Sequence, residues 1–165
     1  MLISGVNSEL VLLEVEWKTI FFFSGLFMLV GGIEATGVIA KLAEGVITLT
    51  GGDLFLTAMA ILWVSAIASA FIDNIPFVAT MIPLILQMGV MTDMNITPLW
   101  WALSLGACLG GNGTAIGASA NVVAIGMAER EGYKITFGHY FRIAFPVMLI
   151  TIAISTVYII FVYLL

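Results

Sequence analysis

One acidic side chain lies deep inside an apolar part of the sequence. Asp73 is preceded by the apolar residues from Leu54 onward and is followed by a second apolar run that reaches Val90. A carboxylate at the centre of a lipid bilayer costs about 2.5 to 3.5 kcal/mol on insertion scales unless a partner or water relieves it. We therefore interpret Asp73 as a residue that binds a cation or a proton. The alternative is that it only caps a helix, and the two roles are compatible.

Neutral oxygen-bearing side chains accompany Asp73 in two segments of the chain. Asn74 is adjacent to it, and Ser69 and Thr80 lie on either side. Amide and hydroxyl oxygens are ligands that hard cations such as sodium prefer. The alternative is that serine and threonine hydroxyls bond to carbonyls of their own helix. The predicted ion or substrate site consists of Asp73, Asn74, Asn112, Thr114, Ser119 and Asn121, with sodium a candidate ligand at the first two.

Enzyme chemistry fits these residues poorly. A membrane aspartyl protease needs two carboxylates that share one site, and Asp73 has no acidic companion at its depth. A serine protease needs a base beside its nucleophile, whereas His139 lies in a charged loop. Cys108 is the single cysteine, which excludes a cysteine-based metal cluster of the usual ligand count. We expect no enzyme activity and no cofactor other than a coupling sodium ion or proton.

The composition indicates a membrane protein. Of the 165 residues, 62% are hydrophobic and 9% are charged, whereas about a quarter of the residues of a typical soluble domain are charged. The ten acidic and five basic residues lie mostly between apolar runs, so they describe loops and not a charged binding face. We therefore predict an all-α, multi-pass protein of the cell membrane, with lipid as its main partner and no nucleic-acid binding.

Two apolar stretches predict ordinary spanning helices. The first covers 17–42 and opens with Trp17, and the last covers 141–165 and ends near Tyr158 and Tyr163. Their lengths suit a hydrocarbon core of about 30 Å, and aromatic side chains are typical of membrane interfaces. The whole chain, 1–165, is then a single transmembrane domain.

The stretch 54–90 predicts a re-entrant hairpin. A single helix over this range would be about 55 Å long, which is too long for one crossing and short for two. Asp73 and Asn74 favour a turn, and Pro76 disfavours a helical conformation at Ile75. The tip should lie near 73–76. Backbone that leaves its helix within the bilayer must be buried in protein or line a wet cavity.

The stretch 98–127 predicts a broken helix. An unbroken helix would be about 45 Å long. Gly110, Gly111 and Gly113 occupy three of four consecutive positions, which makes continuity unfavourable. Two interrupted apolar segments in one chain are the pattern that points to a transporter site.

The loops suggest an orientation. Arg130, Lys134 and Arg142 are three of the five basic residues and lie in 128–142, which should therefore be cytoplasmic. This places the carboxy terminus and both ends of the hairpin outside. The opening segment, 1–16, has no basic region and no cleavage pattern, so we do not expect a signal peptide there.

The motifs resemble those of one known family. The segment Trp63–Phe77, which contains Asp73-Asn74-Ile75-Pro76, together with 110–114 and 116–121, is similar to the arsenite-permease and sodium/proton-antiporter family of the ion transporter superfamily. The melanosomal P protein belongs to the same group. Val15-Glu16-Trp17 and the segment 21–27 also look like this family, so the resemblance covers nearly the whole chain.

The resemblance implies an inverted-repeat transporter, of which this chain matches the carboxy-terminal half. Each half would carry a re-entrant hairpin and a broken helix that meet near the middle of the membrane. We expect secondary active transport by alternating access, either cation/proton antiport or efflux of an anion such as arsenite. One repeat provides half a site, so the expected partner is a second copy or a separate amino-terminal half. The alternative is a structural or regulatory membrane partner without transport activity, or an incomplete fragment.

Overall fold

The computed structural model describes residues 17–165, apart from the side chains of Lys18 and Thr19. The signal-peptide prediction and the Val15-Glu16 part of the resemblance fall outside these residues. Every regular element in the described range is helical, which confirms the all-α membrane class. The helices are α2 (Trp17–Ala35), α3 (Val38–Thr50), α4 (Leu54–Ser69), α5 (Asn74–Thr92), α6 (Thr97–Gly110), η1 (Gly111–Gly113), α7 (Ser119–Arg130), α8 (Phe137–Ile159) and η2 (Ile160–Leu164).

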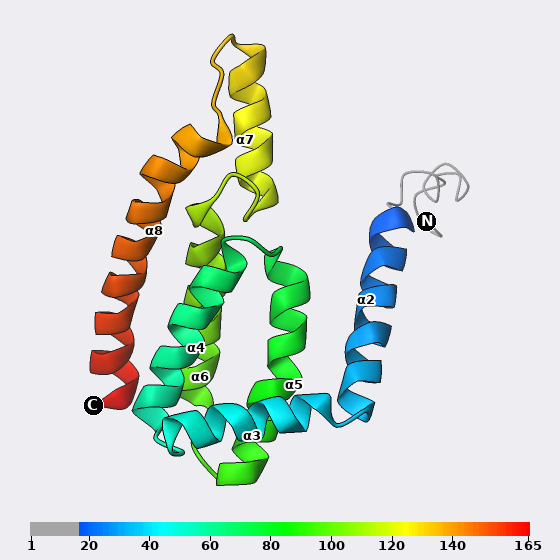
Figure 1. Cartoon of the computed structure of the whole chain (residues 1–165), viewed down its shortest axis with the longest axis vertical. Coiled ribbons are helices and arrows are strands. Elements are labelled where there is room, and N and C mark those ends of the chain that lie inside the picture. Colours follow the sequence, from blue (N-terminus) through cyan, green and yellow to red (C-terminus); the bar gives the residue numbers. More distant parts are fainter. Residues whose placement is uncertain (1–16) are drawn as a thin grey trace, which may run out of the picture.

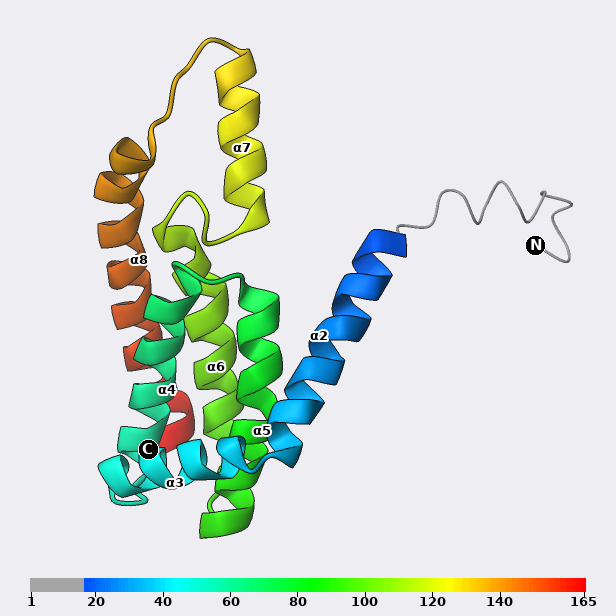
Figure 2. The same cartoon turned by 45° about the vertical axis from the view of Figure 1, so that its right-hand side comes forward.

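The core of the molecule lies where α4, α6 and α8 pack together, with α5 alongside (Figures 1 and 2). Its fully buried side chains include Leu62 from α4, Leu99 from α6 and Ile152 from α8. Trp63 also joins α4 to α8, because its indole N–H donates to Thr156 Oγ1 at 3.1 Å. This bundle holds the elements that carry the predicted site.

Two glycines bring α6 into close contact with α4. A Cβ atom at Gly106 would lie 2.5 Å from the carbonyl oxygen of Leu62, and one at Gly110 would lie 2.5 Å from Cα of Ala66. Such distances are shorter than any tolerable contact, so only glycine permits this packing. Small residues at a helix interface commonly serve this purpose in membranes.

The range 54–90 forms two adjacent helices, as Figure 1 shows for α4 and α5. α4 ends at Ser69 and α5 begins at Asn74. Pro76 does not displace Ile75 from the helix as expected. It lies in the first turn of α5, where a missing N–H costs nothing because that group has no partner within the helix. That the pair is re-entrant within the membrane remains a prediction.

The range 98–127 is interrupted at the glycine-rich segment. α6 ends at Gly110, η1 follows, and the backbone is extended at Thr114 and Ala118 before α7 begins. Figure 1 shows α7 continuing beyond the end of α6. α7 contains no buried residues.

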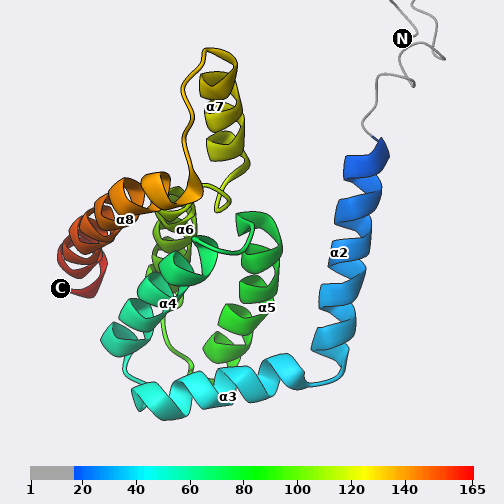
Figure 3. The ribbon, with the colours of Figure 1, turned by 45° about the horizontal axis from the view of Figure 1, so that its top comes forward.

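The first apolar stretch differs from the continuous helix expected over 17–42. α2 ends at Ala35, α3 begins at Val38, and the two helices are bent by 69°. Gly37 lies between them with a φ of 75°, a left-handed conformation that glycine adopts without steric cost. Hydropathy alone does not reveal this bend. α2 stands at the edge of the bundle, beside α5 (Figure 3).

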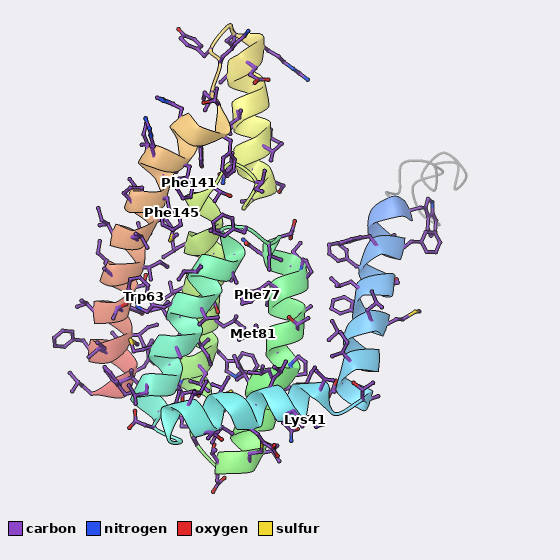
Figure 4. All side chains as sticks on the ribbon, in the orientation of Figure 1. Lys41, Trp63, Phe77, Met81, Phe141 and Phe145 are labelled. Carbon is purple, nitrogen blue, oxygen red and sulfur yellow. The ribbon has the colours of Figure 1, made fainter. Side chains whose placement is uncertain are left out.

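α3 runs crosswise near the start of α4 and packs mainly on α5, whose carboxy-terminal end extends past it (Figures 1 and 4). One of its faces packs on the bundle through Ile39 and Ala43, which are buried. A second face exposes Leu42 and Leu49, and a third face carries Lys41 and Glu44. A helix with packed, apolar and charged faces is typical of the plane of a membrane interface.

The last helix begins earlier than the expected 141. α8 starts at Phe137, after Thr136, whose hydroxyl accepts the N–H of His139 at 3.3 Å, and it contains Pro146. Phe141 and Phe145 stack along it with ring centroids 4.7 Å apart (Figure 4). By length and composition, α5 and the helix Phe137–Leu164 can each cross a membrane, and the bent α2–α3 pair is a third candidate span.

Candidate functional site

The turn of the hairpin and the break after α6 are in direct contact. The buried hydroxyl of Thr114, in the break, donates to the carbonyl oxygen of Ala70, at the end of α4. The hydroxyl oxygen of Ser69 lies 2.6 Å from the carbonyl oxygen of Ala107, one turn before the break. The two interruptions of the apolar sequence therefore meet at one place in the fold. We call this place the junction; it is formed by Ser69 and Ala70 from the hairpin and by Ala107 and Thr114 from the broken helix.

Gly117 is enclosed by backbone oxygens from both interruptions. A Cβ atom on Gly117 would lie 2.5 Å from the oxygen of Gly111, 2.8 Å from that of Ala70 and 3.1 Å from that of Ser69. Carbonyl oxygens at the ends of interrupted helices are the groups that coordinate cations in transporters with broken helices. The junction thus concentrates negative partial charge around a residue that must be glycine.

Asp73 borders a small cavity at this junction. The cavity has a volume of about 140 Å³. It is lined by Asp73, Asn74, Ile75, Gly117, Ala118 and Ser119. Asp73 also caps α5, because its carboxylate accepts the N–H of Ile75 at 3.0 Å. The capping role and a place beside a cavity therefore occur together.

Asn74 is the polar residue at the centre of the junction. Its half-buried side chain accepts a hydrogen bond from Ser69 and lies beside Gly111. It also lines a second cavity, of about 450 Å³, between α5 and α6. The other residues around that cavity are Val78, Ile82, Trp100, Leu103, Ser104, Ala107 and Cys108. Asn74 thus borders space on two sides.

The remaining predicted residues occupy different places. Asn121 donates from Nδ2 to the carbonyl oxygens of Gly111 and Thr114, both at 3.0 Å, and so fixes the backbone of the break. Asn112 is exposed, and its carbonyl oxygen accepts a hydrogen bond from Tyr140 at 3.5 Å. Asp73, Asn74 and Ser119 line the small cavity, Thr114 and Asn121 support it, and Asn112 is not among the residues around it.

Sequence reasoning about side chains missed the backbone groups of the site. The carbonyl oxygens of Ala70 and Gly111 and the position of Gly117 carry no polar side-chain signal. The clustered glycines of 110–117 were the available signal, because a glycine inside an apolar segment often marks a close backbone approach. Ser69 was recognised only as a flanking hydroxyl, whereas the structure places it against both interruptions.

The helix ends give the junction both signs of partial charge. The cavity lies at the amino terminus of α5 and at that of α7, where Ala118 has no polar side chain to cap the first N–H groups. Helix amino termini favour anions, whereas the carbonyl ends of α4 and α6 favour cations. No group of three or more His, Cys, Asp or Glu side chains forms a metal site within residues 17–165. The arrangement suits a simple ion or a small charged solute.

Two interrupted helical segments that meet beside a cavity are an arrangement found in transporters with broken helices. The profile of the citrate transporter family matches residues 1–106, and the chain belongs to this family. An uncharacterized transporter of Mycobacterium tuberculosis is 48% identical over 160 residues. A 46 kDa membrane protein of Mycobacterium leprae is 44% identical over 160 residues, and the human P protein is 42% identical over 157 residues. The predicted family relationship is thereby confirmed.

The alignments cover most of this chain and a minor part of each relative. They include 96% of the chain and 37% of the two mycobacterial proteins, and 91% of the chain and 19% of the human P protein. The chain therefore spans little more than a third of the mycobacterial relatives that it matches.

Proposed function

We propose that this chain provides half of the substrate site of a secondary active transporter. The observation that carries the proposal is the contact between the hairpin turn and the break after α6, with a cavity lined by Asp73, Asn74 and Ser119 at that contact. Asp73 binds the coupling cation, sodium or a proton, assisted by nearby carbonyl oxygens. Asn74 and Ser119 supply neutral ligands, while Asn112, Thr114 and Asn121 belong to the break that shapes the site.

The substrate is an ion or a small charged solute. Citrate is the first candidate, because the matching family is described as citrate transporters. The amino termini of α5 and α7 favour the carboxylates of such an anion. Cation/proton antiport and arsenite efflux are the other candidates. In each case the site opens alternately to the two sides of the membrane, with the loop 128–142 cytoplasmic and the carboxy terminus outside.

The completed site needs a second half, from another copy of the chain or from an amino-terminal half. The coverage of 37% of the mycobacterial relatives supports this requirement. The mass of the assembly purified from its native membrane distinguishes a dimer, a complex with another chain and a lone chain. A lone chain without flux supports the second candidate function, a membrane partner that does not transport.

The test is flux through the assembly as it is purified, reconstituted in liposomes. Uptake of labelled citrate and of arsenite is measured with and without sodium and proton gradients. We expect Asp73→Asn to lower cation-dependent flux by about tenfold or more, because the amide keeps the helix cap but cannot carry the charge. Asp93→Asn is the matched control, since Asp93 lies exposed at the opposite end of α5 with a φ of 53° that asparagine tolerates. Equal flux in the Asp73 variant and the wild type contradicts the assigned role.

A further inference from the structure

The two legs of the hairpin are held to the rest of the molecule in different ways. The first leg, α4, is fixed to both of its neighbours. Two glycines of α6 pack directly on its backbone, and Trp63 donates to Thr156 Oγ1 in α8 at 3.1 Å. At the end of α4, Thr114 donates to the carbonyl oxygen of Ala70. The second leg, α5, has fewer such attachments near the junction.

Pro83 divides α5 into a tightly packed part and a loosely packed part. The part after it is anchored in the core of the molecule. Its buried side chains are Leu84, Ile85 and Met88. In the part before it, residues 74–82, Ala79 is the one buried residue, and the others are half-buried or exposed. We call residues 74–82 the arm.

Few hydrogen bonds hold the arm in place. Proline has no N–H group, so the helical hydrogen bond that position 83 would donate to the carbonyl oxygen of Ala79 is missing. The hydroxyl of Thr80 donates to Phe77 within the same helix. Among the described residues, one hydrogen bond joins a side chain of the arm to another helix, and it lies between Asn74 and Ser69 at the tip.

The arm has open space on two sides. Val78 and Ile82 line the cavity of about 450 Å³ next to α6, and they also line a cavity of about 280 Å³ on the side of Phe27 in α2. Proline is among the few features at which a helix bends sharply. Asp73 and Asn74, at the end of the arm opposite Pro83, line the small cavity at the junction. A sideways movement of the arm therefore changes the shape of that cavity.

We propose that Pro83 is a hinge, and that the arm moves about it in the space between α2 and α6, opening and closing the small cavity at the junction. The inference rests on the proposed function and names the moving part of that site. α4 and the part of α5 after Pro83 stay with the bundle, because both are packed into it. The hairpin therefore does not move as one rigid unit.

The test measures movement of the arm separately from transport. Cys108 is the single cysteine of the chain and lines the cavity next to α6, opposite Val78. In the variant Val78→Cys, the purified assembly is oxidised with copper phenanthroline, and the disulfide between positions 78 and 108 is followed over time by mass spectrometry. A disulfide needs the two Cα atoms within about 7 Å, so its rate of formation reports the approach of the arm to α6. We expect the added substitution Pro83→Ala to slow this reaction about fivefold, because bending must then break one more hydrogen bond.

Pro146→Ala is the matched control, because it removes the proline inside α8 and should leave the rate of disulfide formation unchanged. Pro83→Ala should denature at the wild-type temperature or above it, since alanine favours a helix interior, so a slower reaction does not reflect misfolding. The disulfide should stop flux, and a reductant should restore it. The inference is overturned if no disulfide forms, if Pro83→Ala leaves its rate unchanged, or if the cross-linked assembly keeps full flux. A rate that depends on Pro83 in an assembly without any flux leaves the hinge standing and refutes transport.

Discussion

The hairpin turn and the break after α6 both interrupt a helix, but they differ in how far their residues are buried. Both take the backbone out of a helix in the middle of an apolar segment. In the break, Gly111, Gly113, Thr114 and Gly117 are all buried, and Asn121 binds two of the carbonyl oxygens. In the turn, Phe71, Ile72 and Asp73 are exposed.

The difference assigns a separate task to each interruption. In the break, the Thr114 hydroxyl and the Asn121 amide bind backbone carbonyl oxygens, so the shape of the break is set by the fold. The turn leaves its acid and the first turn of α5 facing open space, so it can respond to a ligand. Unpaired polar groups are costly in an apolar environment, and a membrane protein keeps them only where water or a ligand completes them. Substitutions in the break should therefore affect stability first, and substitutions in the turn should affect transport first.

The largest loss of stability is expected where the two interruptions touch. Gly117→Ala places a Cβ atom 2.5 to 3.1 Å from three backbone oxygens, and backbone atoms cannot move aside as a flexible side chain can. We expect the free energy of unfolding to fall by about 3 kcal/mol or more, the upper end of the usual cost of overpacking, because three backbone oxygens are in the way. Thermal denaturation in detergent measures the change. Gly126→Ala is the control, because a Cβ atom there meets nothing within 4 Å, and it should not destabilise the protein.

A smaller loss is expected when the hydrogen bond between the interruptions is removed. Thr114→Val keeps the shape of the side chain and leaves the carbonyl oxygen of Ala70 without its donor. The cost of an unsatisfied buried acceptor is about 1–3 kcal/mol. The same denaturation assay applies. Thr48→Val serves as the control, since Thr48 is exposed and bonds only to the carbonyl oxygen of Glu44 in its own helix; equal losses in the two variants would show that the contact does not hold the junction.

The smallest change in stability is expected at Asp73. Asparagine caps helices about as well as aspartate, so Asp73→Asn should keep the hydrogen bond to Ile75 and the denaturation temperature. Its effect on flux is large in our proposal. A marked fall in the denaturation temperature of Asp73→Asn would show that the turn, like the break, is needed for stability, and would contradict the proposed difference between the two.

The sequence predicted the interruptions better than the packing around them. Asp73-Asn74 and the glycines of 110–113 contradict the helical pattern of their surroundings, so local chemistry located both. The bend at Gly37 escaped prediction because a single glycine in an apolar helix is compatible with continuity, and only tertiary packing of α3 selects the left-handed conformation. At Pro76 the sequence predicted a non-helical Ile75 that the structure does not have, because proline is tolerated in the first turn of a helix.

For the site, the sequence indicated which residue types to expect but not which of them line the cavity and which hold the backbone in place. Asn112 and Asn121 look equivalent beside the glycines, yet one is exposed and the other binds two backbone oxygens. The oxygens around Gly117 are backbone oxygens, and the type of a residue does not indicate where its backbone oxygen will lie. Contacts between segments far apart in the chain determine both the different places of the two asparagines and the set of oxygens around Gly117.

The crosswise helix α3 provides a reference level for depth. α4 rises from it through 16 residues to the turn, a height of at most about 24 Å at 1.5 Å per residue. A hydrocarbon layer about 30 Å thick would therefore enclose the turn, nearer to the face opposite α3. A solute that passes between the level of α3 and Asp73 would therefore move along nearly the full height of α4.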